Sequence, residues 1–375
     1  MKTDLFLRAA PAAAVLALAA GCATVRPLPP PPGPKAEILD VHHHIAGLGV
    51  GSDCWVSERF KSSLTYKGAM SGFEVNEETA RKNGDFWVAS KYAAILRESR
   101  YVSKALLMAM DGVIKEDGVT LDLDKMDWYQ SNEFVRDVCR RNPDVFLYCC
   151  SINPLRKDAV ERLRRCCADG AVAIKWLPNA MHFDPSDPRI LPFYKECKRL
   201  GIPIITHTGA EHTASNCIQE YGNPAKLIPA LDLGVTIVAA HCALTDTGNG
   251  TNDFDVFLRL MRQYPNLYGD TAGINGPGYG NTGAIPKLAA HPEIHDRILF
   301  ATDMPSPNVY LISTPKWYWR NLTGHEIAEL EKIKNRYDQD IMLKKTLGLP
   351  DKAFTGGFRI IRDPKAPLPP PEKGD

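Results

Sequence analysis

The sequence predicts an α/β protein whose folded body is a (β/α)8 TIM barrel. Two observations lead to this prediction. Short apolar, β-branched runs alternate with segments of helical periodicity along residues 37–350, and a repeated strand-then-helix order indicates a parallel sheet. Eight such runs occur, over a length that suits a fold of roughly 250 residues with insertions. An open, doubly wound sheet is the alternative.

The expected strands and helices follow one another along the chain. The strands cover residues 38–45, 102–110, 145–152, 171–177, 202–206, 235–240, 267–269 and 298–301. Amphipathic helical segments between them include residues 133–141, 159–167, 190–200, 224–233 and 253–263. Two additions extend the barrel: a long insertion, residues 47–100, after the first strand, and a helical C-terminal segment, residues 324–347.

Both ends of the chain are expected to lie outside the folded body. Residues 1–21 have the charge and the short apolar run of an export signal. Residues 18–22 resemble the lipobox of bacterial lipoproteins, which predicts a lipid anchor on Cys22 and a body that faces the periplasm. An ordinary signal peptide with a chance cysteine is the alternative. Residues 22–36 form a Pro-rich linker, and residues 351–375 form a Pro-rich tail.

Composition excludes several classes of protein. Lys and Arg total 45 against 44 Asp and Glu, so no global charge attracts the chain to nucleic acid. Hydrophobic residues at 44% and charged residues at 24% are typical of a soluble globular domain. None of the ten cysteines lies in a CxxC motif, and Cys149 and Cys150 fall in an apolar run. We therefore expect mostly buried free thiols.

Metal-ligand residue types stand at the ends of four predicted strands. In residues 38–45, His42 and His44 share one face of a strand, and His43 points the other way. His207 and His241 each end an apolar run, and Asp303 follows the last run. Any one of these residues alone would more often be structural.

A barrel gathers the carboxyl ends of its strands at one face, where active sites lie. Three imidazoles and a carboxylate around an open water position suit a catalytic divalent ion, and zinc is favoured.

The sequence resembles the amidohydrolase superfamily, in the amidohydrolase-related branch that includes aminocarboxymuconate-semialdehyde decarboxylase. The resemblance spans about residues 38–349. It depends on the HxH of residues 42–44, on residues 171–178, on the stretch from Gly201 to Gly209 and on residues 301–305. It implies metal ligation by His42, His44, His207 and Asp303. It also implies that His241 lies beside the attacking water as a polarising or proton-handling group.

Lys175 and Trp176, at the end of the fourth strand, are further candidates. Lys175 resembles the carboxylated lysine that bridges two metals in other branches of the superfamily, so a carboxylated Lys175 would imply two ions. One ion is the more usual expectation in this branch. Lys175 is then either a cation for an anionic substrate group or a structural residue. Trp176 is more often a packing residue, but its place beside Lys175 could make it face the pocket.

These residues predict metal-dependent hydrolysis of an ester, lactone or amide carbonyl in a small, anionic substrate. Asp303 would take the proton of the water and return it to the leaving group, and His241 would orient the water or stabilise the oxyanion. Non-oxidative decarboxylation of an aromatic or unsaturated acid at the same metal site is the alternative. A lipoprotein that binds a ligand without turnover is a third hypothesis. The oligomeric state stays open, and a homodimer is compatible with the sequence.

Overall fold

The computed structural model describes residues 26–71, 75–275, 283–305 and 314–370. The predicted signal segment 1–21 and Cys22 lie outside these residues. No helix in the described ranges is long and apolar enough to cross a membrane.

The centre of the fold is a sheet of eight parallel strands in the order β1-β3-β5-β6-β7-β8-β9-β10. The strands are β1 (Leu39–His43), β3 (Lys104–Met108), β5 (Phe146–Cys150), β6 (Ala173–Trp176), β7 (Ile204–His207), β8 (Ile237–Ala240), β9 (Leu267–Asp270) and β10 (Ile298–Leu299). Backbone hydrogen bonds from Val41 N to Phe300 O (3.1 Å) and from Asp303 N to His42 O (2.9 Å) join the last strand to the first. The predicted barrel is confirmed, and the doubly wound alternative is wrong.

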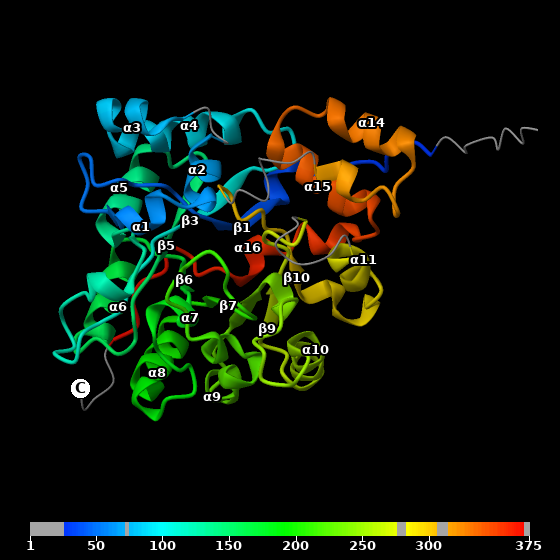
Figure 1. Ribbon diagram of the computed structural model, residues 1–375. Coiled ribbons are helices and arrows are strands. Elements are labelled where there is room, and N and C mark those ends of the chain that lie inside the picture. The colour runs from blue at the N-terminus through cyan, green and yellow to red at the C-terminus, as the bar shows by residue number, and fades with distance from the viewer. Residues whose placement is uncertain (1–25, 72–74, 276–282, 306–313, 371–375) are drawn as a thin grey trace, which may run out of the picture.

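Helices surround the barrel (Figure 1). Those of the βα units are α5 (Asn132–Arg141), α6 (Ala159–Ala168), α7 (Pro178–Met181), α8 (Leu191–Leu200), α9 (Ile228–Asp232), α10 (Asp253–Gln263) and α11 (Ala284–Ala289). Capping residues set several boundaries: the Ser131 side chain accepts from Phe134 N at the start of α5, and α8 ends at Gly201, which has a φ of 62°.

The insertion after β1 folds into four helices, α1 (Glu58–Lys61), α2 (Leu64–Ser71), α3 (Glu77–Asn83) and α4 (Asp85–Arg97). It also contributes β2 (Trp55–Val56), which pairs antiparallel with β4 (Trp128–Tyr129) from the segment after β3. The C-terminal segment forms α13 (Thr314–Trp317), α14 (Gly324–Lys332), α15 (Arg336–Thr346) and α16 (Gly357–Ile360). Figure 1 shows α14 and α15 together at one side of the barrel and α1–α4 grouped at another.

Apolar side chains fill the interior of the barrel. Leu39, Leu106, Ile205, Val238 and Leu299, from five different strands, are fully buried in one cluster. A larger cluster lies between the sheet and the helices. Of the nine described cysteines, all free, only Cys217 is not buried, as the sequence predicted.

The expectation that the chain is unfolded beyond Pro350 is wrong for residues 351–362. Phe354 is 1% exposed and Ile360 is 8% exposed. Helix α16 packs against β1, and a Cβ on Gly357 would lie 2.9 Å from Leu39 Cβ. Arg362 N donates to Val172 O over 2.9 Å. The apolar residues of this segment therefore close one end of the barrel, although prolines follow them in the sequence.

Candidate metal centre

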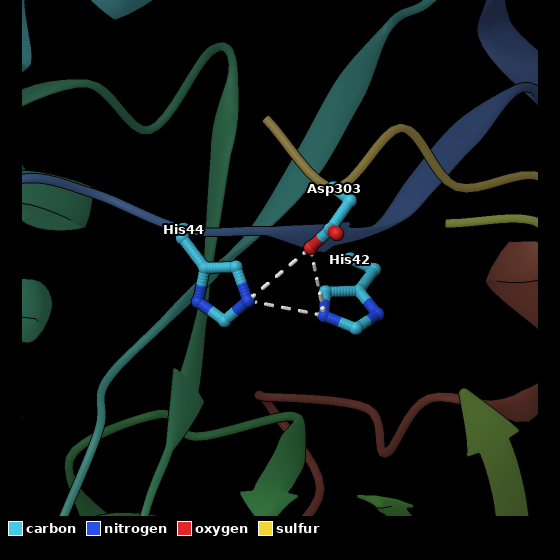
Figure 2. Close-up of side chains that lie close together, drawn as sticks. All are labelled: His42, His44 and Asp303. Atoms are coloured by element: carbon cyan, nitrogen blue, oxygen red, sulfur yellow. Dashed lines mark hydrogen bonds and ion pairs between the residues drawn. The ribbon is translucent and has the colours of Figure 1, made fainter. Parts of the chain in front are cut away.

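Two imidazoles and one carboxylate converge at the carboxyl ends of the first and last strands. His42 Nε2 lies 3.1 Å from His44 Nε2, and each of these nitrogens lies 3.4 Å from Asp303 Oδ1. Figure 2 shows the three side chains turned toward a common point. The atoms are close enough together to hold one metal ion.

An irregularity in β1 aims these histidines. Leu39 and Val41 both point into the barrel interior, so strict alternation would turn His43 inward as well. The register of β1 against β3 shifts between Asp40 and His43, as at a bulge that re-aims a side chain. His43 consequently points outward, where its Nε2 lies 2.7 Å from Tyr337 Oη. The predicted division of the histidine run is confirmed.

Asp270, at the end of β9, orients His42. Its Oδ2 lies 3.0 Å from His42 Nδ1, and its Oδ1 accepts from His241 N over 2.8 Å. Burial would raise the pKa of Asp270, but the electrostatic interaction with His42 and the hydrogen bond to it outweigh burial and lower that pKa to about 2. An ionised Asp270 fixes the proton of His42 on Nδ1, so Nε2 presents its lone pair to the cavity.

The backbone around Asp303 is held by Asp40. Asp303 has a φ of 69°, a left-handed conformation that is unusual for a residue other than glycine. The Asp40 carboxylate accepts from Thr302 N (3.0 Å), Thr302 Oγ1 (2.5 Å) and His42 N (3.1 Å). These bonds tie the residue before Asp303 to the strand that carries His42. Burial raises the pKa of Asp303, but the nearby imidazoles, His42 first, lower it far below its usual range.

His207 and His241 complete the same cavity but stand outside the three-residue cluster. His207 Nδ1 lies 3.4 Å from Glu211 Oε2, and its Nε2 is buried with no hydrogen-bond partner among the residues that the structure describes. The His241 ring centroid is 5.2 Å from that of His42 and 4.9 Å from that of His207. His241 Nδ1 lies 2.7 Å from Ala272 O.

Burial favours the neutral form of three imidazoles of the site. It lowers the pKa of His44 to about 4 and that of His241 to about 3, and it lowers the pKa of His207 as well. Neutral imidazole is the form that binds metals. The two close Nε2 atoms, the ionised carboxylate and the unpartnered Nε2 of His207 therefore fit a divalent cation with nitrogen and oxygen ligands.

Lys175 and Trp176 lie on opposite faces of β6. Lys175 is 1% exposed, lines the cavity, and places Nζ 2.6 Å from His42 Nε2. Burial lowers the pKa of its ammonium group. Trp176 points the other way: its Nε1 donates to Ile152 O over 2.8 Å, and its ring packs on Phe183 at 4.9 Å. The expectation that Trp176 faces the pocket is therefore corrected, because adjacent residues on a strand point to opposite faces.

The cavity above these residues has a volume of about 200 Å³. Sequence reasoning missed several of its lining residues, among them Phe60, Trp128 and Glu211. Glu211 lies four positions after His207, in the loop that follows β7. This short spacing from a predicted ligand is the one sequence signal for Glu211. Phe60 and Trp128 carry no such signal, because an apolar pocket wall and an apolar core have the same composition.

Comparison with known proteins identifies the family. Residues 39–335 match the family model described as amidohydrolase, so the chain belongs to the amidohydrolase family. This is a family of metal-dependent enzymes. No curated protein matches the sequence.

Several solved structures are similar to this one. An uncharacterised TIM-barrel protein from Bordetella bronchiseptica is 17% identical with a TM-score of 0.51, over 82% of this chain and 99% of the other. A candidate 2-pyrone-4,6-dicarboxylic acid hydrolase from Pseudomonas putida is 14% identical with a TM-score of 0.49, over 83% and 97%. A manganese-bound 5-carboxyvanillate decarboxylase from Novosphingobium aromaticivorans is 10% identical with a TM-score of 0.42, over 80% and 93%. The first of these supports the barrel fold.

Proposed function

We propose that this protein is a metal-dependent hydrolase that cleaves an ester, lactone or amide bond in a small substrate. The observation that carries the proposal is the convergence of His42 Nε2, His44 Nε2 and Asp303 Oδ1, within 3.4 Å of one another, at the base of a cavity. His207 is the proposed fourth ligand, because its buried Nε2 faces no partner among the described residues.

A divalent ion held by these residues, with zinc favoured, would polarise the substrate carbonyl and lower the pKa of a water molecule toward neutrality. The protein's own groups handle the protons. Asp303, kept ionised by the surrounding imidazoles, accepts a proton from the attacking water. It then returns that proton to the leaving oxygen or nitrogen as the carbonyl bond breaks.

His241 and Lys175 complete the proposed machinery. His241 lies within the same cavity. Its Nδ1–H donates to Ala272 O and burial keeps the ring neutral, so its Nε2 carries a lone pair that can accept from the water and orient it. The Lys175 ammonium would attract an anionic substrate group toward the ligand end of the cavity.

A decarboxylase is the second candidate, and the aromatic side chains of the cavity favour it. Phe60 and Trp128 both line the cavity, with ring centroids 4.8 Å apart, and a planar acid could stack against them. The same ligands would hold the substrate while carbon dioxide leaves and a proton is delivered to carbon.

Metal content and product analysis test these proposals together. The purified protein is analysed for metals and is then given esters, lactones, amides and aromatic carboxylic acids before and after chelation. One equivalent of divalent metal with chelator-sensitive hydrolysis supports the hydrolase, and carbon dioxide release without hydrolysis supports the decarboxylase. Two equivalents would indicate a carboxylated Lys175. Binding of a metal or another ligand without turnover would support the ligand-binding lipoprotein, and absence of metal from the replete protein would refute both enzymes.

Matched variants locate the site. His42→Ala together with His44→Ala should abolish metal binding. His325→Ala is the control, because His325 is exposed on α14.

We also propose that the barrel is anchored to a membrane through a lipid on Cys22 and faces the periplasm. The lipobox-like sequence and the Pro-rich residues 27–34 support this proposal. Labelling with a fatty acid in a bacterial host should mark the wild-type protein and not Cys22→Ser. Equal labelling of both would refute the anchor.

A further inference from the structure

We infer that this pocket selects substrates with an apolar acyl group, an aromatic ring or a branched alkyl chain, over hydroxylated or multiply charged ones. The inference rests on the proposed function for the reacting end of the substrate. It depends on how the lining of the cavity is divided.

The cavity is lined by the polar candidate ligands and by a separate group of apolar side chains, here called the wall. The wall comes mostly from the insertion after β1 and from β4. Its side chains are Leu48, Val56, Phe60, Tyr66, Met70 and Trp128. Phe60 lies between two of the aromatic rings, with its centroid 4.8 Å from that of Trp128 and 6.0 Å from that of Tyr66. A substrate group in contact with this wall would exchange water for carbon atoms and rings.

Among the hydrogen-bonding groups beside these apolar residues, the Gln130 side chain is already used, and the Tyr66 hydroxyl is buried without a partner among the described residues. The Gln130 Oε1 atom accepts from Gly47 N over 2.9 Å, and its Nε2 donates to Gly47 O over 3.1 Å. No arginine lines the described part of the cavity. The several hydroxyl groups of a sugar acid, or a second carboxylate, would lose more hydrogen bonds to water here than the Tyr66 hydroxyl can replace, which costs binding free energy.

The wall is held in place by Asp127, the residue before Trp128. Its Oδ1 accepts from Arg59 Nη2 (2.8 Å) and Arg59 Nε (3.0 Å) on α1. Its Oδ2 accepts from Ser215 N (2.6 Å) and Ser215 Oγ (2.8 Å) in the loop after β7. This carboxylate therefore joins the insertion, β4 and the loop beyond His207, so the wall is formed before substrate arrives.

The size of the cavity agrees with a group as large as a ring. An apolar protein cavity of about 150 Å³ binds benzene, and this cavity has about 200 Å³ in total. After the reacting carbonyl is placed at the ligands, the remaining space suits one ring or a short branched chain.

Binding and turnover of matched compounds test the inference on the metal-loaded full chain. Phenylacetate and gluconate are titrated by calorimetry, and the matching phenylacetate ester and gluconolactone are assayed for hydrolysis. We expect phenylacetate to bind at least about 10-fold more tightly than gluconate, with the negative heat-capacity change of apolar burial. We expect kcat/KM to favour the phenylacetate ester in the same direction.

Variants of the wall sharpen the test. Trp128→Ala should raise KM for the phenylacetate ester by about 10- to 100-fold, with metal content and kcat little changed, and Trp128→Phe should restore most of the loss. Trp317→Ala is the control, because Trp317 is 40% exposed and does not line the cavity.

Two results would overturn the inference while leaving the proposed function intact: a preference for gluconate and gluconolactone, or an unchanged KM in Trp128→Ala. Failure of the proposed function is different, since it appears as absent metal or absent turnover. Phenylacetate titration of the same protein still tests the wall in that case.

Discussion

At the scale of single residues, the ligand end of the pocket depends on carboxylates that would not touch the metal. Asp270 holds His42 through Nδ1 at 3.0 Å and is fully buried. Partners of this kind typically change metal affinity by about 10- to 100-fold. We predict that Asp270→Asn weakens metal binding by this factor, as measured by competition with a chromophoric chelator. Asp232→Asn, at an exposed carboxylate, should leave the affinity unchanged, and equal affinity of all three proteins would contradict the prediction.

The bond between Thr302 and Asp40 should matter for both stability and metal binding. Thr302→Val removes a buried hydroxyl that donates to the Asp40 carboxylate over 2.5 Å. Burial raises the pKa of Asp40 to about 7, so the Asp40 carboxyl is charged only above that pH. A hydrogen bond to a charged group is worth about 1.5–3 kcal/mol, so urea unfolding of the metal-free variant above this pH should show a loss of this size. Because the bond also supports the left-handed backbone of Asp303, metal affinity should fall as well. Loss of stability with unchanged affinity would show that Asp303 does not depend on it.

The residues at the strand ends were predictable from sequence because a barrel gathers strand ends. His42, His44, His207, His241 and Asp303 all line the one cavity. Trp176 was misplaced, although alternation along β6 puts it opposite Lys175. The role of Asp270 needed coordinates, because only the folded barrel shows which imidazole this residue at the end of β9 holds.

At the scale of elements, the anchoring of the insertion depends on the charge of Asp127. Burial raises the pKa of this carboxyl, but hydrogen bonds from Ser215 and the ion pair with Arg59 outweigh burial and lower it below 3.8. A lowered pKa in the folded state means that the stabilisation is present above pH 3.8 and is lost as the pH falls through the still lower folded value.

We therefore predict that residues 56–61 lose protection from amide hydrogen exchange as the pH drops below 3.8. In Asp127→Asn, the same residues should be less protected already at neutral pH. The variant should also show a KM for an apolar ester raised about 10-fold, which corresponds to ~1.4 kcal/mol. Asp144→Asn, which breaks an exposed ion pair with Arg97, is the matched control. Exchange in Asp127→Asn that equals the wild type at neutral pH would argue against this role.

A second prediction at this scale concerns helix α16 and its packing against the barrel. A chain that ends at Pro350 loses Phe354 and Ile360, which are buried against the barrel. Each such side chain contributes about 1.5–3 kcal/mol, so thermal unfolding should show a loss of several kcal/mol or no folded protein. A chain that ends at Asp363 keeps α16 and should unfold near the wild-type temperature. A stable, wild-type-like chain ending at Pro350 would disprove the role of α16 as a closing element.

The strands of the barrel could be predicted because each lies in an apolar run that is long enough to stand out in the sequence. The insertion after β1 and the α16 segment could not be predicted in this way. In residues 47–100 the short helices have little amphipathic pattern, and β2 has only two residues. The α16 segment was hidden by the prolines that follow it. Its burial depends on Leu39 and Val41, which are more than 300 positions earlier in the chain.

At the scale of the whole molecule, metal binding should stabilise the fold. Ligands that bind only the folded state add about 4 kcal/mol at 1,000 times their dissociation constant. We predict that chelation lowers the unfolding temperature of the wild type by several degrees, and that added zinc restores it. The double variant His42→Ala with His44→Ala should show no shift, and His325→Ala should behave as the wild type. If the unfolding temperature of the wild type changes neither on chelation nor on addition of zinc, the proposed metal centre is contradicted.

The barrel closes at a seam, where the last strand, β10, and the residues after it meet the first strand, β1. This seam determines when in folding the candidate ligands come together. Asp40 and Thr302, which fasten this seam, are 262 positions apart, and the candidate ligands stand directly beside them on both sides. A nascent or unfolded chain can present His42 and His44 early, but Asp303 joins them only after the last strand has docked against the first. We therefore expect the proposed ion to be acquired late in folding. For a chain that crosses a membrane unfolded, the ion would be drawn from the compartment in which folding finishes.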